Sequence, residues 1–277
     1  MLAVGVSFFA GLAVSAQAAD VSLARFDCGT PQAPTAVNQR FSDTYAYGDL
    51  KVQFVFSCYL IKHDGDYMLW DTGHAMTAPN VAPKVGLVEY LAKIEVNPDQ
   101  IKYVGISHYH ADHTGQIASF PKATLLIGAK EWEAISSPKP AEGVNYKPFE
   151  SWIKGDSKVE PQPVDKDVFG DGSVTVLRAP GHTPGHSGYM IASGNESLLI
   201  WGDIVHVPDI QIPHPEVTIE FDTDPHAAAA TRKRLLDMVA TDRQLVAGMH
   251  MHYPGFAHVT RQGDSYLMLP EPWDQGF

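Results

Sequence analysis

Apolar runs of strand length are separated by polar turns along the first half of the chain. Residues 52–61 and 67–70 are rich in β-branched, aliphatic and aromatic side chains and predict two strands. Residues 85–94 place apolar side chains at helical spacing and predict a helix. Residues 101–107 predict a short buried strand, which leads directly into a histidine-rich segment.

The second half of the chain repeats this arrangement. Residues 174–178, 197–201 and 245–248 predict three strands, and each is followed within a few positions by Asp or His. Residues 225–240 predict a helix that Asp224 can cap. No change of composition separates the two halves, so we predict one α/β domain whose chemistry lies on the loops at strand ends.

One segment, residues 136–166, departs from the pattern. It contains several prolines and scattered charges but few aliphatic residues. A long irregular segment inside a compact domain is often a lid or a binding loop. A plain surface excursion is the alternative, and the sequence does not separate the two.

The N-terminus has the composition of a secretory signal. Residues 1–15 are almost wholly apolar, and the small-x-small sequence AQA follows at residues 16–18. The apolar run is too short for a comfortable membrane anchor. We expect residues 1–18 to be a signal peptide and residues 19–277 to form the mature domain, in the periplasm or outside the cell. Because no basic residue precedes the apolar run, an apolar first helix of the fold is the alternative.

The two cysteines, Cys28 and Cys58, both lie in strand-like runs. In an oxidising compartment they could form a disulfide. They could equally be small buried core residues. The sequence leaves both readings open, and neither cysteine stands in a metal-ligand motif.

Composition and charge narrow the class of partner. The 277 residues are 44% hydrophobic and 19% charged, as in ordinary globular proteins. The net charge of -12, from 20 basic and 32 acidic residues, repels phosphate backbones and anionic lipids. We therefore expect a small-molecule substrate, no nucleic-acid partner and, after removal of the signal, no membrane partner. A homodimer is left open.

The strongest chemical signal is the sequence HYHADH at residues 108–113. His108 and His110 are two positions apart, so in extended backbone they project to one side and can hold one metal ion. Asp112 and His113 follow where the chain turns, and can face a second ion. Imidazole and carboxylate ligands suit zinc, and also manganese, iron and cobalt. Such groups are costly to bury together without a metal, so we predict metal binding.

Three more candidate ligands follow predicted strands. These are His182, Asp203 and His250. They are needed because four residues cannot fill two coordination spheres. An Asp after an apolar strand is often a cap or turn residue. Beside six other ligands, however, Asp203 is the expected bridge, since one carboxylate can span two cations.

These motifs resemble those of the metallo-β-lactamase superfamily. HYHADH at residues 108–113 is similar to its HxHxDH motif, and APGHTPGH at residues 179–186 to its second histidine motif. WGD at residues 201–203 is similar to its bridging-aspartate motif, and residues 247–259 to its last histidine motif. DTG at residues 71–73 is similar to the turn that supports the site. The resemblance covers nearly all of the mature chain and implies a four-layer αββα sandwich with a dinuclear site at the edge of its two sheets.

The resemblance also assigns individual residues. In the second histidine motif the family's ligand is the first histidine, which implies His182 rather than His186. In the last motif it implies His250 rather than His252. The resemblance further implies that Asp71 accepts a hydrogen bond from a ligating imidazole and fixes the orientation of that ring.

The site predicts a hydrolase. Two cations close together can share a bridging hydroxide, lower its pKa towards neutrality and polarise an ester, lactone, amide or phosphoryl oxygen. We expect Asp112 to protonate the leaving group. His206 stands three residues after Asp203, where lactonases of the superfamily often have a tyrosine that contacts the substrate carbonyl. That likeness implies a role for His206 in polarising or protonating the substrate.

The substrate class follows from a second likeness. Residues 206–232 are similar to a branch that contains methyl parathion hydrolase and related lactonases and arylesterases. This implies a lactonase or esterase, acting for example on acyl-homoserine lactones or aryl esters. Organophosphate triester hydrolysis and β-lactam hydrolysis are alternatives, but true β-lactamases carry Cys or Ser where this chain has Asp203. A non-enzymatic metal-binding protein is disfavoured because all seven ligands are present.

Overall fold

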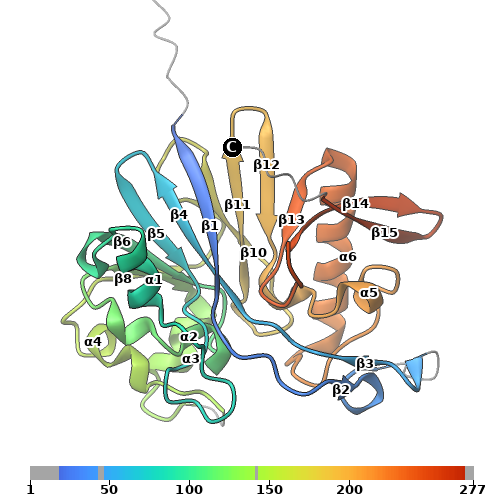
Figure 1. The fold of residues 1–277 in the computed structure, drawn as a ribbon, viewed down its shortest axis with the longest axis horizontal. Coiled ribbons are helices and arrows are strands. Elements are labelled where there is room, and N and C mark those ends of the chain that lie inside the picture. Colours follow the sequence, from blue (N-terminus) through green and yellow to red (C-terminus); the bar gives the residue numbers. More distant parts are fainter. Residues whose placement is uncertain (1–18, 43–46, 141–142, 272–277) are drawn as a thin grey trace, which may run out of the picture.

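Two large sheets face each other at the centre of the molecule, and helices cover their outer faces (Figure 1). The computed structural model describes residues 19–42, 47–140 and 143–271. The predicted signal peptide, residues 1–18, lies outside the described residues. The order of layers is helix, sheet, sheet, helix, so the predicted αββα sandwich is confirmed.

The first sheet has six strands and is built from the first half of the chain. Its first three strands pair antiparallel, and the next pairings, from β5 through β6 and β7 to β8, are parallel. In sheet order the strands are β1 (Val21–Asp27), β4 (Ser57–His63), β5 (Asp66–Trp70), β6 (Ile101–Ile106), β7 (Thr124–Gly128) and β8 (Val159–Gln162).

The second sheet has seven strands and is built from the second half. Its pairings are antiparallel except for β12 with β13, so β10, β12 and β13 run in the same direction and end at the same edge. In sheet order the strands are β15 (Ser265–Pro270), β14 (Phe256–Gln262), β13 (Leu245–Ala247), β12 (Glu196–Ile200), β11 (Ser187–Ser193), β10 (Val174–Arg178) and β9 (Lys166–Asp167).

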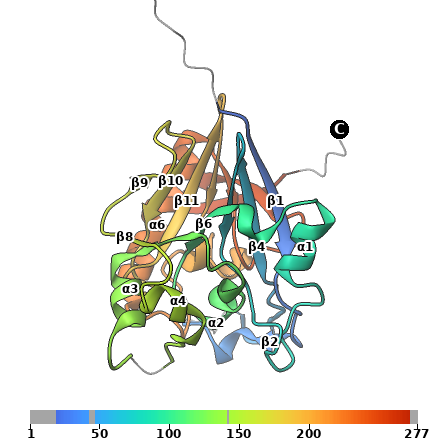
Figure 2. The same ribbon diagram turned by 90° about the vertical axis from the view of Figure 1, so that its left-hand side faces the viewer.

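Helices lie on both outer faces and at one end of the sandwich (Figure 2). They are α1 (Leu87–Lys93), α2 (Ala111–Thr114), α3 (Ala129–Ser136), α4 (Glu150–Ile153), α5 (Pro208–Gln211) and α6 (Pro225–Asp242). Short 3-10 turns are η1 (Val37–Gln39), η3 (Pro98–Gln100), η4 (Ile117–Ser119), η5 (Lys147–Phe149) and η6 (Gly202–Ile204).

The core between the sheets consists of large side chains that alternate strand positions send inward. This arrangement removes a wide apolar area from water, which is the main favourable contribution to folding. The fully buried members from the first sheet are Tyr59, Ile61, Met68, Trp70 and Leu126, and those from the second are Val174, Val176, Tyr189, Ile200 and Ala247.

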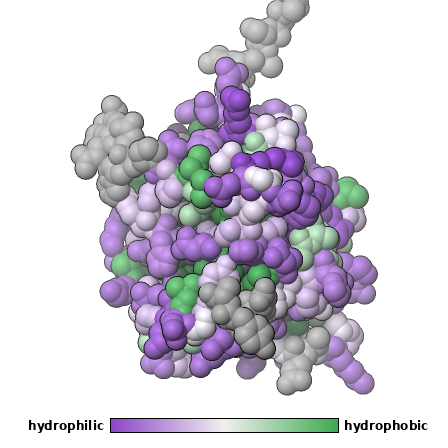
Figure 3. Space-filling model, turned by 90° about the vertical axis from the view of Figure 1, so that its right-hand side faces the viewer, coloured by the Kyte–Doolittle hydropathy of each residue, from purple (hydrophilic) through white to green (hydrophobic). Residues whose placement is uncertain are grey.

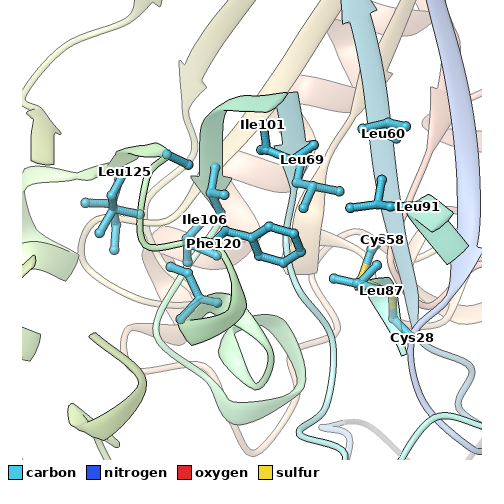
Figure 4. Packing of buried hydrophobic residues seen from close by; sticks show 14 of the residues in the cluster. Cys28, Cys58, Leu60, Leu69, Leu87, Leu91, Ile101, Ile106, Phe120 and Leu125 are labelled. Atoms are coloured by element: carbon cyan, nitrogen blue, oxygen red, sulfur yellow. A yellow bond between two sulfur atoms is a disulfide. The ribbon is translucent and has the colours of Figure 1, made fainter. Parts of the chain in front are cut away.

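The other face of each sheet is covered by a helical layer. On the second sheet, α6 buries Leu235, Leu236 and Val239 against the strands. Asp224 caps this helix as predicted, because its side chain accepts a hydrogen bond of 3.0 Å from the N–H of Ala227. On the first sheet, α1, α3 and α4 contribute to a separate apolar cluster (Figure 4).

Cys28 and Cys58 are joined by a disulfide inside this cluster on the first sheet (Figure 4). Of the two readings that the sequence leaves open, the structure therefore shows the bonded one. The two residues are 30 positions apart, and the chain between them leaves the sheet. That excursion forms a separate two-stranded sheet of β2 (Thr35–Ala36) and β3 (Lys51–Val52).

The predicted strand over residues 52–61 is wrong in its first part. The strand of the main sheet is β4, which begins at Ser57, and the residues between β3 and β4 make loop contacts. The Phe56 carbonyl accepts from the N–H of Cys28 at 2.8 Å, and the Val55 carbonyl accepts from a histidine ring. Their apolar composition has another cause, since Phe54 and Phe56 line a cavity.

Residues 136–166 contain more structure than the sequence indicated. Phe149 and Trp152, from η5 and α4, are buried in the cluster on the first sheet. β8 completes that sheet at its edge. None of the described residues in this segment lines the cavity formed in part by Phe54 and Phe56, so the lid hypothesis finds no support there.

The surface agrees with the expected polar character. The face in Figure 3 is mainly hydrophilic, with hydrophobic residues scattered among polar ones. Within the described part of the chain, no helix combines the length and hydropathy that a membrane span requires.

Candidate metal centre

Four strand-end loops bring the predicted ligands together at one end of the sandwich. His108 and His110 follow β6, and Asp112 and His113 lie on α2 directly after them. The other three ligands follow β10, β12 and β13, whose ends share one edge of the second sheet; they are His182, Asp203 and His250.

The first ligand group consists of three histidines. The Nδ1 atom of His110 lies 2.9 Å from Nε2 of His108 and 3.1 Å from Nε2 of His182. His108 and His182 are fully buried, whereas His110 is partly open to the cavity. Three imidazole nitrogens therefore converge on one point.

The second ligand group contains two carboxylates and two imidazoles. Nε2 of His113 lies 3.4 Å from an oxygen of Asp112 and 3.2 Å from Oδ2 of Asp203. Nε2 of His250 lies 3.2 Å from the same Asp203 oxygen. These four side chains form a second cluster beside the first.

Asp203 stands between the two groups. Its Oδ2 atom, besides its contacts in the second group, lies 3.8 Å from Nε2 of His108 and 3.7 Å from Nε2 of His182. A single carboxylate oxygen thus faces nitrogens of both groups. This is the position that a bridging ligand would occupy.

The donor atoms fit metal ions better than they fit each other. Nitrogen lone pairs do not face each other at 2.9 and 3.1 Å unless a proton or a cation lies between them. Tetrahedral zinc, with bonds of about 2.0–2.1 Å, holds its nitrogen ligands roughly 3.3 Å apart. In the second group, Nε2 of His113 and Oδ1 of Asp203 are buried without a hydrogen-bond partner among the described residues. Such groups are costly to bury, and cations would satisfy them.

Three of the candidate ligand rings are each oriented by a hydrogen bond on the other nitrogen. Nδ1 of His113 donates to Asp71 at 2.6 Å, as the family resemblance implied. Nδ1 of His182 donates to Asp222 at 2.9 Å, and Nδ1 of His250 donates to the Val55 carbonyl at 2.8 Å. These bonds leave the three Nε2 atoms free to point into the clusters, an arrangement typical of metal-binding histidines.

The environment of the first group keeps His108 and His110 neutral. Burial, together with the rings of His113 and His110, lowers the pKa of His108 well below its ordinary value. Burial and the His182 ring lower the pKa of His110 to about 4. Neutral imidazoles are the form that binds metal, so these two rings are ready to act as ligands near neutral pH.

The carboxylates of the second group are held in the charged form. Burial raises the pKa of Asp203, but the rings of His113, His250 and His206 outweigh it and hold the pKa well below its ordinary value. The His113 ring acts in the same way on Asp112. Two adjacent anionic side chains in a buried site attract cations strongly.

The residues around Asp203 restrict its backbone. Gly202 has a positive φ of 61°, and a Cβ atom there would lie only 2.5 Å from the His186 ring. The same ring accepts a hydrogen bond of 2.9 Å from the N–H of Asp203. His186 is therefore a buried supporting residue, which agrees with the assignment of His182 as the ligand of that motif.

Glu131 connects the two histidine loops and was not found by sequence reasoning. It lies fully buried on α3 and accepts from the N–H of Tyr109 at 3.0 Å and from the N–H of Gly185 at 2.7 Å. Tyr109 lies between His108 and His110, and Gly185 lies three residues after His182. No local pattern distinguishes Glu131 from the exposed Glu133 two positions later.

Asp222 and the Val55 carbonyl were also missed. Asp222 lies between two other acidic residues, Glu220 and Asp224, at alternate positions, and its partner His182 is 40 positions away. A backbone carbonyl exists at every residue, so composition gives no signal for Val55. Only the folded arrangement of these loops reveals their contacts.

The ligand groups lie at the wall of a cavity of about 370 Å³. His206 lines it beside the clusters, with Nε2 at 3.2 Å from Oδ2 of Asp203. Both ring nitrogens of His206 lack a hydrogen-bond partner among the described residues. His74 also lines the cavity, whereas His252, the rejected ligand of the last motif, is exposed.

Known proteins resemble this chain in sequence. The family model described as Metallo-beta-lactamase superfamily matches residues 55–250. N-acyl homoserine lactonase AttM of Rhizobium radiobacter is 30% identical over 161 residues, which are 51% of this chain and 61% of that protein. N-acyl homoserine lactonase AiiA of Bacillus thuringiensis subsp. kurstaki is 26% identical over 239 residues, 77% of this chain and 85% of that protein.

The fold is also shared with solved structures. One is described as AidC, a dizinc quorum-quenching lactonase, in complex with the product of its reaction. Its TM-score is 0.77 at 22% identity, and the match covers 94% of this chain and 97% of AidC. At this level of identity the likeness concerns the fold.

Proposed function

This chain belongs to the metallo-β-lactamase superfamily, and from that premise we propose that it is a dinuclear metal-dependent hydrolase of lactones or esters. The observation that supports this most is the convergence of seven donor side chains at the wall of a cavity, in two groups with Asp203 in contact with both. N-acyl homoserine lactones are the first substrates to consider, because AttM and AiiA carry that activity in their names.

We assign the two ligand groups to two divalent cations, with zinc as the first choice. His108, His110 and His182 would hold one ion, Asp112, His113 and His250 the other, and Asp203 both. Bound there, the ions would supply a water nucleophile at neutral pH and stabilise charge on a carbonyl oxygen. Borderline-soft nitrogen donors with carboxylates suit zinc, while manganese, iron and cobalt also accept this set.

Two side chains are placed to handle protons and polarise the substrate. Asp112 lines the cavity, and a carboxylate oxygen there can take a proton from the attacking water and deliver it to the leaving oxygen. His206 lines the same cavity, and its ring can donate a hydrogen bond to the substrate carbonyl.

A substrate screen tests this function. The protein is loaded separately with zinc, manganese or cobalt, and lactones, aryl esters, β-lactams and phosphotriesters are offered to each form. We expect turnover of lactones or aryl esters that disappears on chelation and returns with metal. Turnover confined to β-lactams or phosphotriesters would overturn the proposed substrate class, and no turnover by any metal form would overturn the proposed activity.

We also propose that the protein works in the periplasm or outside the cell. Support comes from the apolar residues 1–15, the AQA sequence after them and the disulfide between Cys28 and Cys58. N-terminal sequencing of the protein from its native host should find a chain that begins at or near residue 19. An intact Met1 in a cytosolic fraction would refute this proposal.

A further inference from the structure

The segment that joins β12 to α6 carries much of the candidate site. Asp203 stands near its start, and His206, three residues later, lines the cavity. Near its end, Asp222 accepts the hydrogen bond of 2.9 Å from Nδ1 of His182. Between residues 201 and 224, all of which the structure describes, the only helical elements are η6 and α5, of three and four residues. The shape of this segment therefore depends on contacts with side chains.

Arg232, a fully buried residue of α6, is bonded to this segment at three points. Its Nε atom donates to the Ile204 carbonyl at 2.5 Å. Its Nη1 atom donates to the carbonyls of Pro215 and Val217, each at 2.7 Å. A guanidinium group holds its donors in a rigid plane, so these three acceptors are fixed relative to one another. The segment is thus folded around a single side chain.

The same guanidinium lies beside the carboxylate that orients His182. Nη2 of Arg232 lies 3.9 Å from Oδ2 of Asp222, while Oδ1 of Asp222 accepts from His182. Burial lowers the pKa of Arg232 to about 10, and Asp222 acts in the opposite direction, so the guanidinium is charged near neutral pH. Opposite charges that are buried together compensate each other, and removal of one leaves the other uncompensated.

The contacts of Arg232 extend to two further residues of the site. Ile204 directly follows Asp203 in the chain, so the Nε bond fixes the backbone beside the expected bridging ligand. The Val217 carbonyl also accepts from Nε2 of Gln211 at 3.2 Å, and Oε1 of Gln211 accepts from the N–H of His206 at 2.7 Å. The network around this one guanidinium therefore reaches both Asp203 and His206.

We propose that Arg232 is a positioning residue that keeps Asp203 and His182 in the geometry that metal binding requires. This inference rests on the proposed dinuclear site. Arg232 is not among the residues that line the cavity, so it acts through the Ile204 carbonyl and the Asp222 carboxylate and not on the substrate. Helix α6 thus supports the metal centre in addition to covering the second sheet (Figure 1).

Arg232→Met and Arg232→Lys test this role. Methionine removes the charge and the donors, whereas lysine keeps a charge but cannot reproduce the planar set of donors. We expect both variants to bind at least one of the two zinc ions about 10- to 100-fold more weakly in competition with a chelator, as for the loss of a residue that orients a metal ligand. The visible absorption of the cobalt-loaded protein should also change, because it depends on the geometry of the ligands.

Leu236→Ala is the matched control on the same helix. Leu236 is fully buried about one turn further along α6 and belongs to the apolar cluster under that helix. Its truncation should lower the denaturant concentration at the unfolding midpoint, as Arg232→Met should. Zinc affinity and the cobalt spectrum of the folded control, however, should remain those of the unaltered protein.

A double variant shows whether Arg232 acts through Asp222. Asp222→Asn alone should weaken zinc binding, because a neutral amide is a weaker acceptor for Nδ1 of His182 than a carboxylate. Since the two buried charges compensate each other, Arg232→Met combined with Asp222→Asn should lose less affinity than the product of the separate losses. Independent losses would contradict action through Asp222.

The possible failures are distinguishable. Unchanged zinc affinity and cobalt spectrum in Arg232→Met, with stability lowered as in Leu236→Ala, would make Arg232 a packing residue and overturn the proposal. Normal zinc affinity of Arg232→Lys would also overturn it, since charge would then suffice, and this variant carries the test if Arg232→Met does not fold. None of these measurements needs turnover, so they are separate from the substrate screen. If the unaltered protein did not bind two zinc ions, the proposed site itself would fail, and this inference with it.

Discussion

At the scale of single residues, Asp203 is the side chain on which both ligand groups depend. Its Oδ2 atom lies 3.2 Å from Nε2 of His113 and 3.7 Å from Nε2 of His182, so it contacts both groups. Two cations close together in a buried site repel each other strongly, and a carboxylate between them offsets that repulsion. The negative charge of Asp203 is therefore the property to remove in a test.

Asp203→Asn keeps the shape of the side chain and removes its charge. We expect the second ion to be lost more readily than the first, because three histidines still hold the first. Activity should fall on the order of a hundredfold or more, as when preorganised charge stabilisation is removed. Metal content and lactone turnover measured on the same sample check this.

Asp224→Asn is the matched control for that substitution. Asp224 caps α6 through its side chain and belongs to neither ligand group, so metal content should not change. Its cost should be about 1 kcal/mol of folding free energy or less. If Asp203→Asn instead kept both ions and near-normal turnover, Asp203 would be an ordinary turn residue.

Sequence reasoning was most effective at this scale for the ligands themselves. HYHADH places four donors within six residues, a density that burial does not tolerate without a metal. Supporting residues such as Asp222 could not be found in this way. Their role depends on which distant loop lies beside them, and their residue types are common in turns and caps.

At the scale of elements, α3 fixes the two histidine loops relative to each other. Glu131 accepts from the N–H of Tyr109 in one loop and of Gly185 in the other, and burial raises the pKa of its carboxyl group. Gly185 itself must remain small, since a Cβ atom there would lie 2.6 Å from the backbone nitrogen of Glu131. The first ligand group spans these two loops, so its geometry should depend on Glu131.

Glu131→Gln should therefore weaken the first metal site. The amide replaces one acceptor oxygen with an NH2 group that faces a backbone N–H, and an unmade buried bond costs about 1–3 kcal/mol. We expect lower affinity for one ion in competition with a chelator, together with reduced stability. Glu133→Gln on the same helix is the control, because Glu133 is exposed and forms an ion pair with Lys130 at the surface.

The two outcomes of that comparison are clear-cut. If Glu131→Gln lowered stability but left both metal affinities unchanged, Glu131 would be a packing residue and not a positioning residue. A large effect of Glu133→Gln would show that metal binding depends on the surface of the helix, and not on the hydrogen bonds of Glu131 to the two histidine loops.

Elements with strong periodicity were predicted well, and those with mixed character were not. β10 and α6 follow clear apolar patterns and begin at the predicted residues. The predicted strand over residues 52–61 begins too early because Phe54 and Phe56 line the cavity. A cavity wall can be as rich in aromatic side chains as a buried strand, so the sequence does not distinguish them. The segment 136–166 was difficult for the opposite reason, since its few buried aromatics are spread over short helices.

At the scale of the whole molecule, the candidate metal ligands and the opposite wall of the cavity come from different parts of the chain. All seven candidate ligands follow Cys58 in the chain, while much of the opposite cavity wall lies between Cys28 and Cys58. The disulfide closes the base of that excursion. The order of the layers could be predicted from the family resemblance, but the route of this excursion over the site could not.

The double variant Cys28→Ser, Cys58→Ser tests this separation. Opening a loop of this size should lower the free energy of unfolding by about 2–4 kcal/mol. Metal content should not change, whereas KM for lactones should rise because the cavity wall loses its anchor. Denaturant unfolding, elemental analysis and kinetics on one preparation check the three expectations. Loss of metal without loss of stability would contradict this division of roles.

The central claim is that the site holds two metal ions, and the metal content of the protein tests it most directly. The protein is stripped with a chelator, reloaded with zinc, desalted and measured by elemental analysis alongside its protein concentration. From the seven donors in two groups, with Asp203 in contact with both, we predict about two ions per chain. A reproducible content of one ion or fewer per chain would contradict this account.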